Sequence, residues 1–544
     1  MVDCHLPVIR YLLPPKGLKL SYLHADLVVV GGGIAGLTAV IAAAERGRHV
    51  VLVTKDSLEE SNSFYAQGGV AAVLHATDSF DLHFQDTMRT GDGLSNEEIV
   101  RIVVREGPAA IQRLIGFGST FDSENGVLAL SREGGHSAPR VVHSRDSTGM
   151  EIQRVLIDKA RSLPNVSIHE RWFALDLLQS EGRCAGILIS GMRDGFCAVL
   201  APCTILTSGG AGQIYRETTN PEVACGDGTA MAFRAGARLR DMEFFQFHPT
   251  VLYLPGAPRI LISETARGEG GILRDGRGNR FMSEYHPAAE LAPRDVVSRA
   301  ILKQMVTTQD AHIYLDMTHL DAAFLRARFP KILEFCARYA IDITKDSIPV
   351  RPAAHYGIGG VVADAEGRTT LPGLYACGEV ASSRLHGANR LGSNSLLEGL
   401  VFGWRAALAA SAEIETSETF PVWRPDDDRV LVAGAHMGID VWDLRNSLKA
   451  LMWHNVGIER NAEKLGQARE LMEIWARLVA RTRFATPAGW ELANMLTFAQ
   501  LVTLGAQHRE ESRGVHYRTD FPERDDARWR RSITIERRSF EDAL

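Results

Sequence analysis

The stretch Leu27-Val28-Val29-Val30-Gly31-Gly32-Gly33-Ile34-Ala35-Gly36 decides the fold of this chain. Four apolar residues typical of a buried parallel strand lead into glycines at G-x-G-x-x-G spacing, and an Ala- and Leu-rich segment follows. We predict a strand, a tight turn and a helix. Gly31 permits the turn, Gly33 lets a pyrophosphate approach the backbone, and Gly36 lets the helix pack closely. The pattern therefore indicates a dinucleotide site at the helix N-terminus.

The residues after this helix predict the second strand of a βαβ unit. Gly47 ends the helix, and His49–Thr54 is largely apolar. In an NAD site this strand usually ends in an acid that holds the ribose, but here Thr54 is followed by Lys55, and Asp56 is a doubtful ribose ligand. We predict that Thr54 and Lys55 contact a dinucleotide whose identity these residues leave open.

The composition is that of an ordinary globular enzyme. The chain has 544 residues, of which 45% are hydrophobic and 23% charged, and its net charge is −6. Its length favours about three domains, and the lack of a basic block argues against a nucleic-acid partner. Its seven cysteines form no C-x-x-C pair, which indicates a reducing cytoplasm and no metal or iron–sulfur site. No apolar run reaches the roughly 18 residues of a membrane span, so we expect no membrane partner.

We predict an α/β fold in which a Rossmann-like nucleotide-binding domain is interrupted by a cap. Residues 26–241 and 352–420 form the nucleotide-binding domain, and residues 242–351 form an α+β capping domain. Residues 421–544 form a C-terminal helical bundle, and residues 1–25, which contain three prolines, form a poorly ordered extension. A cap inserted in this way places a substrate pocket over a cofactor.

Periodicity predicts several further elements. Helices are expected at about Ser79–Thr90 and Asn96–Gly116, and strands of one β meander at Val166–Ile168, Cys184–Ser190 and Cys197–Ala201. Three amphipathic helices are expected in the C-terminal domain. Their apolar faces comprise Leu444, Leu448, Leu451 and Met452, then Leu465, Ala468, Met472, Trp475 and Val479, and then Leu492, Met495, Leu496 and Ala499.

Seven further motifs occur along the chain. They are Ser63-Phe64-Tyr65-Ala66-Gln67-Gly68-Gly69, Arg132-Glu133-Gly134-Gly135-His136-Ser137, Gln246-Phe247-His248-Pro249-Thr250, Leu291-Ala292-Pro293-Arg294-Asp295, Pro352-Ala353-Ala354-His355-Tyr356, His386-Gly387-Ala388-Asn389-Arg390 and Glu511-Ser512-Arg513-Gly514. With these motifs the chain resembles the succinate dehydrogenase and fumarate reductase flavoprotein family over about residues 25–530, and within it the members that oxidise L-aspartate. The resemblance implies FAD as the cofactor.

The resemblance also implies the cofactor contacts. Glu379 would hold the FAD ribitol, and Asp227 would contact the nucleotide. The remaining implied contacts are Ser63, Ala66, Gln67, Gly68 and Gly69 in one loop and Asn394, Ser395 and Leu396 in another. Family members that bind FAD covalently carry a histidine just before the A-Q-G-G string, where this chain has Asn62. A non-covalent, dissociable FAD is therefore expected.

A dicarboxylate substrate must be fixed at both ends over the flavin, because misplacing the transferred hydrogen is costly. By resemblance, Arg390 and His355 bind one carboxylate, and an arginine fork suits this task because it makes two parallel bonds. His248, Ser263 and Glu264 surround the other carboxylate. Gln246 is a further substrate-binding candidate. Taken alone, each histidine is more simply interpreted as a hydrogen-bonded structural residue.

Arg294 and Glu133 are the candidates for proton transfer and selectivity. Arg294 corresponds to the family's proton-transfer arginine in fumarate reduction, although a surface ion pair is the plainer interpretation of an arginine at that position. Glu133 stands where succinate and fumarate enzymes carry an apolar residue, and a carboxylate there can pair with an α-ammonium. With His248 and Glu264, these two residues are the predicted catalytic group.

The implied reaction is oxidation of L-aspartate to iminoaspartate, with electrons passed to oxygen, giving hydrogen peroxide, or to fumarate. In the family this is the first step towards quinolinate and NAD, so a quinolinate synthase is a possible partner. A soluble fumarate reductase or a succinate dehydrogenase flavoprotein subunit is the chief alternative, against which Asn62 and Glu133 both argue. A flavin-binding protein that acts mainly through association is a further alternative.

Overall fold

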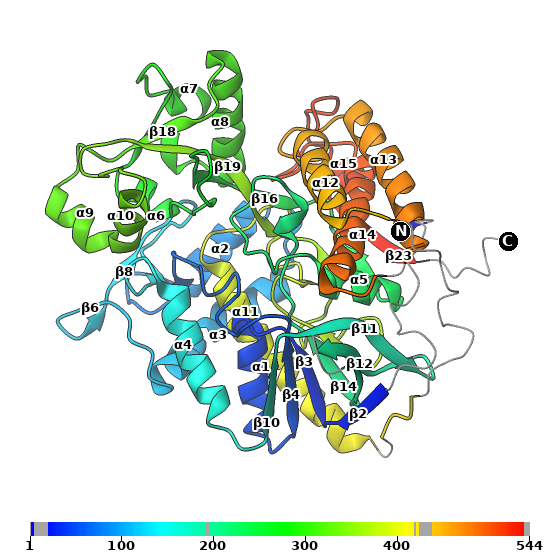
Figure 1. The fold of residues 1–544 in the computed structure, drawn as a ribbon. Coiled ribbons are helices and arrows are strands. Elements are labelled where there is room, and N and C mark those ends of the chain that lie inside the picture. Colours follow the sequence, from blue (N-terminus) through cyan, green and yellow to red (C-terminus); the bar gives the residue numbers. More distant parts are fainter. Residues whose placement is uncertain are drawn as a thin grey trace.

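The computed structural model describes residues 2–4, 20–191, 195–417, 420–423, 438–482 and 484–537. Its centre is a parallel five-stranded sheet of order β10-β4-β3-β14-β21 (Figure 1). These strands span Val166–Glu170, Val50–Thr54, Leu27–Val30, Cys203–Leu206 and Leu374–Ala376. The predicted βαβ unit is therefore confirmed, with strands β3 and β4 paired in parallel on either side of helix α1 (Ile34–Ala44) in the chain.

The glycines of the first turn have the conformations and contacts that the sequence predicted. Gly31 has φ +112°, which an L side chain rarely adopts. A Cβ on Gly36 would lie 2.0 Å from the carbonyl oxygen of Gly31, so only glycine allows α1 to approach the strand this closely. Helix α1 is buried along its whole length, and α11 (Asn394–Thr416) and α4 (Thr148–Arg161) pack against it.

A second sheet, of order β11-β12-β13-β2, forms the predicted meander with one change and one addition. Its strands span Trp172–Ser180, Arg183–Gly191, Gly195–Leu200 and Leu20–His24. Assigning Val166–Ile168 to the meander was wrong, because β10 pairs with β4 in the parallel sheet. Predicting a poorly ordered extension was wrong for β2 and for β1 (Val2–Cys4). Strand β2 is mostly exposed and pairs through its backbone with β13, so it has no buried apolar face that the sequence could reveal. Residues 5–19 lie outside the described ranges.

The inserted segment forms a separate layer with its own hydrophobic core, as Figure 1 shows at the upper left. Its sheet has the order β16-β19-β18-β17, with strands at Phe245–Leu252, Ile348–Gly357, Ile313–Asp316 and Ile272–Arg274. Its helices are α6 (Glu264–Gly268), α7 (Met282–Tyr285), α8 (Arg294–Thr308), α9 (Ala322–Arg328) and α10 (Pro330–Ala337). The expected boundary between residues 351 and 352 lies inside β19, which runs from the cap to the cofactor site.

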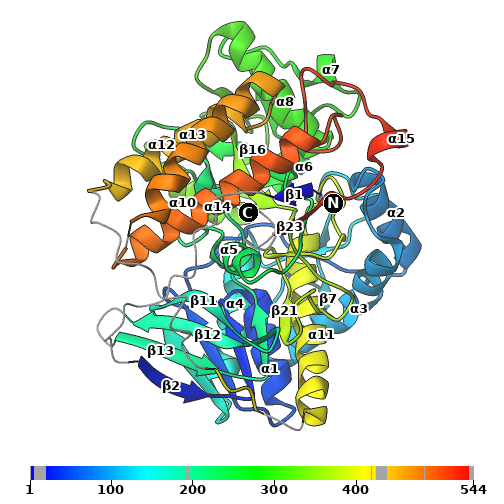
Figure 2. The same cartoon turned by 90° about the vertical axis from the view of Figure 1, so that its right-hand side faces the viewer.

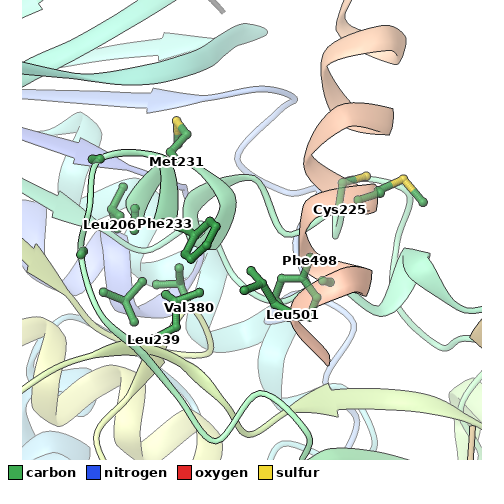
Figure 3. Packing of buried hydrophobic residues seen from close by; sticks show 14 of the residues in the cluster. Leu206, Cys225, Met231, Phe233, Leu239, Val380, Phe498 and Leu501 are labelled. Atoms are coloured by element: carbon green, nitrogen blue, oxygen red, sulfur yellow. The ribbon is translucent and has the colours of Figure 1, made fainter. Parts of the chain in front are cut away.

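The three predicted C-terminal helices are present as α12 (Val441–Asn455), α13 (Ala462–Ala480) and α14 (Pro487–His508), seen side by side in Figure 2. Helix α14 is buried on nearly all sides, because it packs between α13 and α5 (Asp227–Arg234). Figure 3 shows Phe498 and Leu501 of α14 in one apolar cluster with Phe233 and Leu239. The bundle is thus joined to the nucleotide-binding domain through a shared core.

The prediction of a purely helical C-terminal domain was incomplete. Strand β23 (Thr534–Arg537) pairs with β1 and with β15 (Leu239–Arg240), and this sheet continues through β20 (Gly360–Val362) to β22 (Ala381–Ser382). The predicted helices at 79–90 and 96–116 are α2 (Phe80–Thr90) and α3 (Glu97–Gly116), capped by Ser79 and Asn96. The remaining short elements are β5 (Val70–Ala71), β6 (Ser123–Glu124), β7 (Val127–Leu128), β8 (Leu130–Ser131), β9 (Val141–Val142) and α15 (Asp526–Trp529).

The described ranges contain neither a membrane-spanning helix nor a cluster of metal-binding side chains. None of the helices there combines the length and the apolar character needed to cross a bilayer. Within the same ranges, no group of three or more His, Cys, Asp or Glu side chains is arranged to hold a metal ion.

Candidate active site

A cavity of about 690 Å³ lies where the carboxyl ends of the parallel strands, the cap and the start of α11 meet. Its volume falls in the range of small-molecule and cofactor sites. The predicted site residues in its wall are Gly31, Gly33, Thr54, Lys55, Ser63, Ala66, Gln67, Gly68, Gly69, Glu133, Asp227, His248, Ser263, Glu264, Arg294, His355, Glu379, Arg390, Ser395 and Leu396. The structure thus gathers residues spread over more than 360 positions of the chain around one space.

Three predicted residues lie behind this wall. Gly36 packs against the first turn, as described above. Gln246 is fully buried and contacts two arginines of the site. The side chain of Asn394 pairs with His83, with 2.8 Å between Asn394 Oδ1 and His83 Nε2, and donates to Thr87 Oγ1 at 3.0 Å. It is therefore committed to helix α2 and anchors the N-terminus of α11.

One end of the cavity holds a buried cation between two carboxylates. Lys55 Nζ lies 2.7 Å from Asp227 Oδ2 and 2.6 Å from Glu491 Oε1. Burial disfavours the ammonium, but Asp227 and the other anionic groups around it dominate and raise the pKa of Lys55. Asn494 donates to Asp227 at 2.7 Å. Glu491 and Asn494 belong to α14, so the C-terminal bundle shapes the nucleotide end of the site, which sequence reasoning missed.

The middle of the cavity contains a second buried carboxylate, Glu379. It accepts hydrogen bonds from the Gly357 N–H at 2.9 Å and from Asn62 Nδ2 at 3.1 Å. Burial raises the pKa of Glu379 to about 7. Asn62, the residue at the position of the family's flavin-linked histidine, is therefore an amide partner of the predicted ribitol ligand.

The wall of the cavity fits a flavin dinucleotide. The turn at Gly31–Gly33 presents backbone to the space at the start of α1, where phosphates are favoured. Five buried polar atoms in the wall have no hydrogen-bond partner among the described residues, namely Asn62 Oδ1, Gln67 Oε1, Asp146 Oδ1, Ser208 Oγ and His248 Nε2. Buried polar atoms normally have partners, so a polar ligand that supplies them accounts for this arrangement.

At the other end of the cavity, two arginines converge on one amide. Arg294 Nη1 and Arg390 Nε donate to Gln246 Oε1 at 3.2 and 3.1 Å. Arg390 also donates to Ser395 Oγ at 2.6 Å, and its guanidinium lies over the ring of Tyr356 with 4.6 Å to the centroid. These contacts fix both guanidiniums while leaving further N–H groups to bind a carboxylate.

Glu264 of α6 holds Arg294 of α8, so this contact lies within the cap. Arg294 Nε donates to Glu264 Oε2 at 2.5 Å, and Arg267 Nη2 lies 3.6 Å from Glu264 Oε1. Burial alone would raise the pKa of this carboxyl, but Arg294 and Arg267 lower it below its usual value. Arg294 is therefore a buried cation with a fixed anionic partner, and the interpretation as a surface ion pair does not apply.

The two histidines lie face to edge, with their ring centroids 5.2 Å apart. His248 Nε2 is buried and has no hydrogen-bond partner in the described part of the chain, and His355 Nδ1 lies 2.9 Å from Thr219 Oγ1. Burial and the neighbouring arginines hold the pKa values of both histidines well below their usual range. Both rings are thus neutral hydrogen-bonding groups at pH 7.

Glu133 lines the cavity beside these groups, and among the described residues it forms no ion pair within 4.0 Å. Its Oε2 accepts from Ser393 Oγ at 2.7 Å and its Oε1 from Thr265 Oγ1 at 3.4 Å. A Cβ on Gly392 would lie 2.8 Å from Glu133 Oε2 and 3.2 Å from Arg294 Nη2, so a side chain at this position would crowd both groups. Burial and the charge of Glu264 raise the pKa of Glu133.

Several residues of the site were missed by sequence reasoning. Thr219, Tyr356 and Ser393 support His355, Arg390 and Glu133 respectively. Tyr356 ends a recognised motif without having been given a role, and Ser393 precedes the loop residues Asn394 and Ser395, but threonine and serine in loops carry no distinguishing signal. Their contacts join segments far apart in the chain and become visible only in the fold.

Comparison with known proteins agrees with this geometry. Residues 26–396 match the FAD binding domain family, and residues 445–542 match the C-terminal domain of the fumarate reductase flavoprotein family. Among solved structures, a FrdA variant of quinol fumarate reductase from E. coli superposes with a TM-score of 0.89 at 32% identity, covering 96% of both chains. Sdh1 of Mycobacterium smegmatis, in complex with UQ1, superposes with a TM-score of 0.83 at 33% identity, covering 96% of this chain and 95% of that one.

Curated relatives are more similar in sequence. L-aspartate oxidase of Streptomyces coelicolor is 44% identical, with 97% of this chain and 93% of the relative covered. L-aspartate oxidase 1 of Ralstonia nicotianae is 44% identical, with 92% and 96% covered, and the chloroplastic L-aspartate oxidase of Arabidopsis thaliana is 43% identical, with 92% and 82% covered.

The fold and the site define a flavoprotein oxidoreductase whose cofactor is FAD. The chain belongs to the L-aspartate oxidases, a branch of the succinate dehydrogenase and fumarate reductase flavoprotein family.

Proposed function

We propose that this chain oxidises L-aspartate to iminoaspartate with FAD held without a covalent bond. The observation that carries the proposal is the position of Glu133, a buried carboxylate that lines the same cavity as the arginines joined by Gln246. Two guanidiniums suit a dicarboxylate, and the additional carboxylate suits the ammonium that distinguishes aspartate from succinate.

The residues of the site then have distinct tasks. Arg390 and His355 bind one carboxylate, and His248, Ser263 and Glu264 lie around the other. Glu133 pairs with the ammonium, and its raised pKa suits it to take the proton that leaves the amine before oxidation. FAD, when bound, supplies the acceptor for the hydride of the substrate Cα and passes the electrons to oxygen or to fumarate.

Arg294 has one task in aspartate oxidation and another in fumarate reduction. In aspartate oxidation it binds and polarises the substrate, because Glu264 and Gln246 hold its guanidinium in place. When fumarate is the acceptor, we propose that it delivers the proton, with Glu264 and Arg267 as the adjoining charged groups. An arginine needs such neighbours for proton transfer, since its usual pKa lies above about 12.

The cellular setting is also a proposal. Iminoaspartate is an unstable imine, so a quinolinate synthase that consumes it is the proposed partner. Six cysteines of the described part are buried and free, which supports a reducing cytoplasm as the location.

The test is anaerobic reduction of the purified yellow protein by L-aspartate. We expect the flavin to be released by acid, to bleach with L-aspartate under nitrogen, and to recover in air with formation of hydrogen peroxide. Succinate is the control substrate and should bleach the flavin far more slowly. A flavin that stays on the protein after acid, or that bleaches equally with succinate, would instead support the fumarate reductase alternative, which the structural match to quinol fumarate reductase favours.

A further inference from the structure

Ser393 has a backbone conformation that serine rarely adopts. Its φ and ψ are +62° and −1°, in the left-handed region, where a Cβ costs free energy that glycine avoids. The residue is also buried and immediately precedes α11. Non-glycine residues in this region persist at sites where the surrounding structure requires the side chain, so the hydroxyl is the group to explain.

The hydroxyl of Ser393 donates a hydrogen bond to Glu133 Oε2 at 2.7 Å. The backbone of Ser393 is held independently, since its carbonyl oxygen accepts from the Ala71 N–H at 3.1 Å. A glycine at this position would therefore keep the backbone contact and relieve the strain. What it would lose is the bond to Glu133.

A second contact joins the same two segments. His136 Nδ1 lies 3.2 Å from Arg140 Nη1, and His136 Nε2 lies 3.0 Å from the carbonyl oxygen of Gly392. An arginine only donates, so Nδ1 accepts and Nε2 carries the proton that is donated to Gly392. Burial lowers the pKa of His136 to about 4, in agreement with a neutral ring. The loop that carries Glu133 and the turn that carries Ser393 are thus fixed to each other at two points.

We infer that Ser393 is a positioning residue for substrate selection, which aims the Glu133 carboxylate at the position of the substrate ammonium. This inference rests on the proposed function of Glu133. It adds that selectivity for an amino acid is built on a strained serine in the turn before α11 as well as on the acid itself. Succinate and fumarate have no ammonium, so their binding does not use this contact.

The test compares Ser393→Gly with the unchanged protein. We expect kcat/KM for L-aspartate to fall about tenfold, mostly through KM, because a hydrogen bond to a charged group is lost. Burial and the charge of Glu264 raise the pKa of Glu133, and the hydrogen bond from Ser393 lowers it. Loss of this bond therefore raises the pKa further and moves the acid limb of the pH profile of kcat/KM to higher pH. The dissociation constant of FAD, measured by flavin fluorescence, and the thermal stability should be maintained or improved.

A double-mutant cycle with Glu133→Gln separates the two proposals. If Ser393 acts through Glu133, adding Ser393→Gly to Glu133→Gln changes aspartate kinetics little further. Additive losses, or an unmoved acid limb, would overturn the inference while leaving the role of Glu133 intact. If Glu133→Gln alone left aspartate kinetics unchanged, the proposed function of Glu133 would fail first. Ser393→Ala keeps the backbone strain and lacks the hydroxyl, so it should show the same kinetic loss as Ser393→Gly but lower stability.

Discussion

Arg294 and Arg390 are joined through a single atom, because both guanidiniums donate to the side-chain oxygen of Gln246. The two buried guanidiniums therefore share a neutral amide oxygen and not a carboxylate. Burial and the charge of Arg294 lower the pKa of Arg390 to about 10. A dicarboxylate substrate supplies the missing negative charge, so the pair is preorganised for its ligand.

Replacing Gln246 therefore tests the clamp without touching either arginine. In Gln246→Leu both guanidiniums lose their common acceptor, and the Nε2 bonds to Asn389 Oδ1 and to the Arg390 carbonyl oxygen are lost as well. We expect kcat/KM for L-aspartate to fall by about 10- to 100-fold, because small errors in substrate position are costly. Steady-state kinetics measures this, with bound FAD as the control that should stay constant. Unchanged kinetics would show that Gln246 does not position the pair.

The sequence predicted the parts of this molecule whose signal is local. The G-x-G-x-x-G turn, the helices after Ser79 and Asn96, and the apolar faces of α12 and α13 all depend on residues within a few turns of each other, and all are confirmed. The third predicted helix, α14, is present, but it is buried on nearly all sides and not on one face. Pairings between distant segments carry no such signal. For that reason β10 was placed in the wrong sheet, and β2 and β23 were missed.

The same distinction applies to the candidate site. His248, His355, Arg294 and Arg390 stand in motifs, and the fold brings them to one cavity. The supporting contacts, such as Ser393 to Glu133 across 260 positions, depend on the tertiary structure alone. Asn394 was predicted to contact the cofactor, but its side chain forms hydrogen bonds with His83 and Thr87.

A substitution of Gly36 tests the glycine-rich turn before α1. In Gly36→Ala the new Cβ would meet the Gly31 carbonyl oxygen at 2.0 Å and Thr207 Oγ1 at 2.6 Å, so α1 must move away from the strand. We expect at least a tenfold weaker FAD affinity, since the displaced helix N-terminus no longer meets the pyrophosphate. Fluorescence titration of the apoprotein with FAD measures this. Gly116→Ala is the matched control, because nothing lies within 4 Å of a Cβ there; similar FAD affinities in the two variants would contradict the prediction.

A substitution of Asp86 tests the buried hydrogen bonds that support the loop carrying Glu133. Its carboxylate accepts from Arg140 Nη1, the Ser137 N–H and Ser137 Oγ at 2.7, 2.7 and 2.8 Å. Burial opposes ionisation, but these hydrogen bonds lower the pKa of Asp86. Ionised Asp86 therefore stabilises the fold fully above the ordinary carboxyl pKa, and this stabilisation is lost as the pH falls through the lowered folded-state pKa.

Asp86→Ala should lower the free energy of unfolding by about 2 kcal/mol, because Arg140 keeps Asp78 as a partner but the Ser137 N–H and one N–H of Arg140 lose their buried acceptor. Urea denaturation at pH 7 measures this. Asp158→Ala, which removes an exposed partner of Arg154, is the control and should cost about 0.5 kcal/mol or less. Equal effects of the two substitutions would show that the buried cluster is not a stability element.

Protonation of Glu133 should affect aspartate and fumarate in opposite directions. The groups that surround this carboxyl are Glu264, Arg294 and Arg390, and burial together with Glu264 raises its pKa. Ionised Glu133 adds one negative charge to the site. Aspartate and fumarate each carry two carboxylates, but the ammonium of aspartate makes its net charge −1 and that of fumarate −2. Ionised Glu133 therefore suits aspartate, and neutral Glu133 suits fumarate. His248 and His355 stay neutral across this range, because their pKa values lie well below the usual value.

As the pH rises through the raised pKa of Glu133, we therefore expect kcat/KM for L-aspartate to increase and the affinity for fumarate to decrease. The binding of fumarate to the oxidised enzyme, followed through the flavin spectrum, and aspartate kinetics over the same pH series measure the two trends. In Glu133→Gln both trends should disappear over this pH interval, with fumarate bound about as well as by the neutral form of the unchanged protein. Parallel pH profiles for the two ligands would assign the titration to another group, because a carboxyl that selects between these charges must act on them with opposite sign.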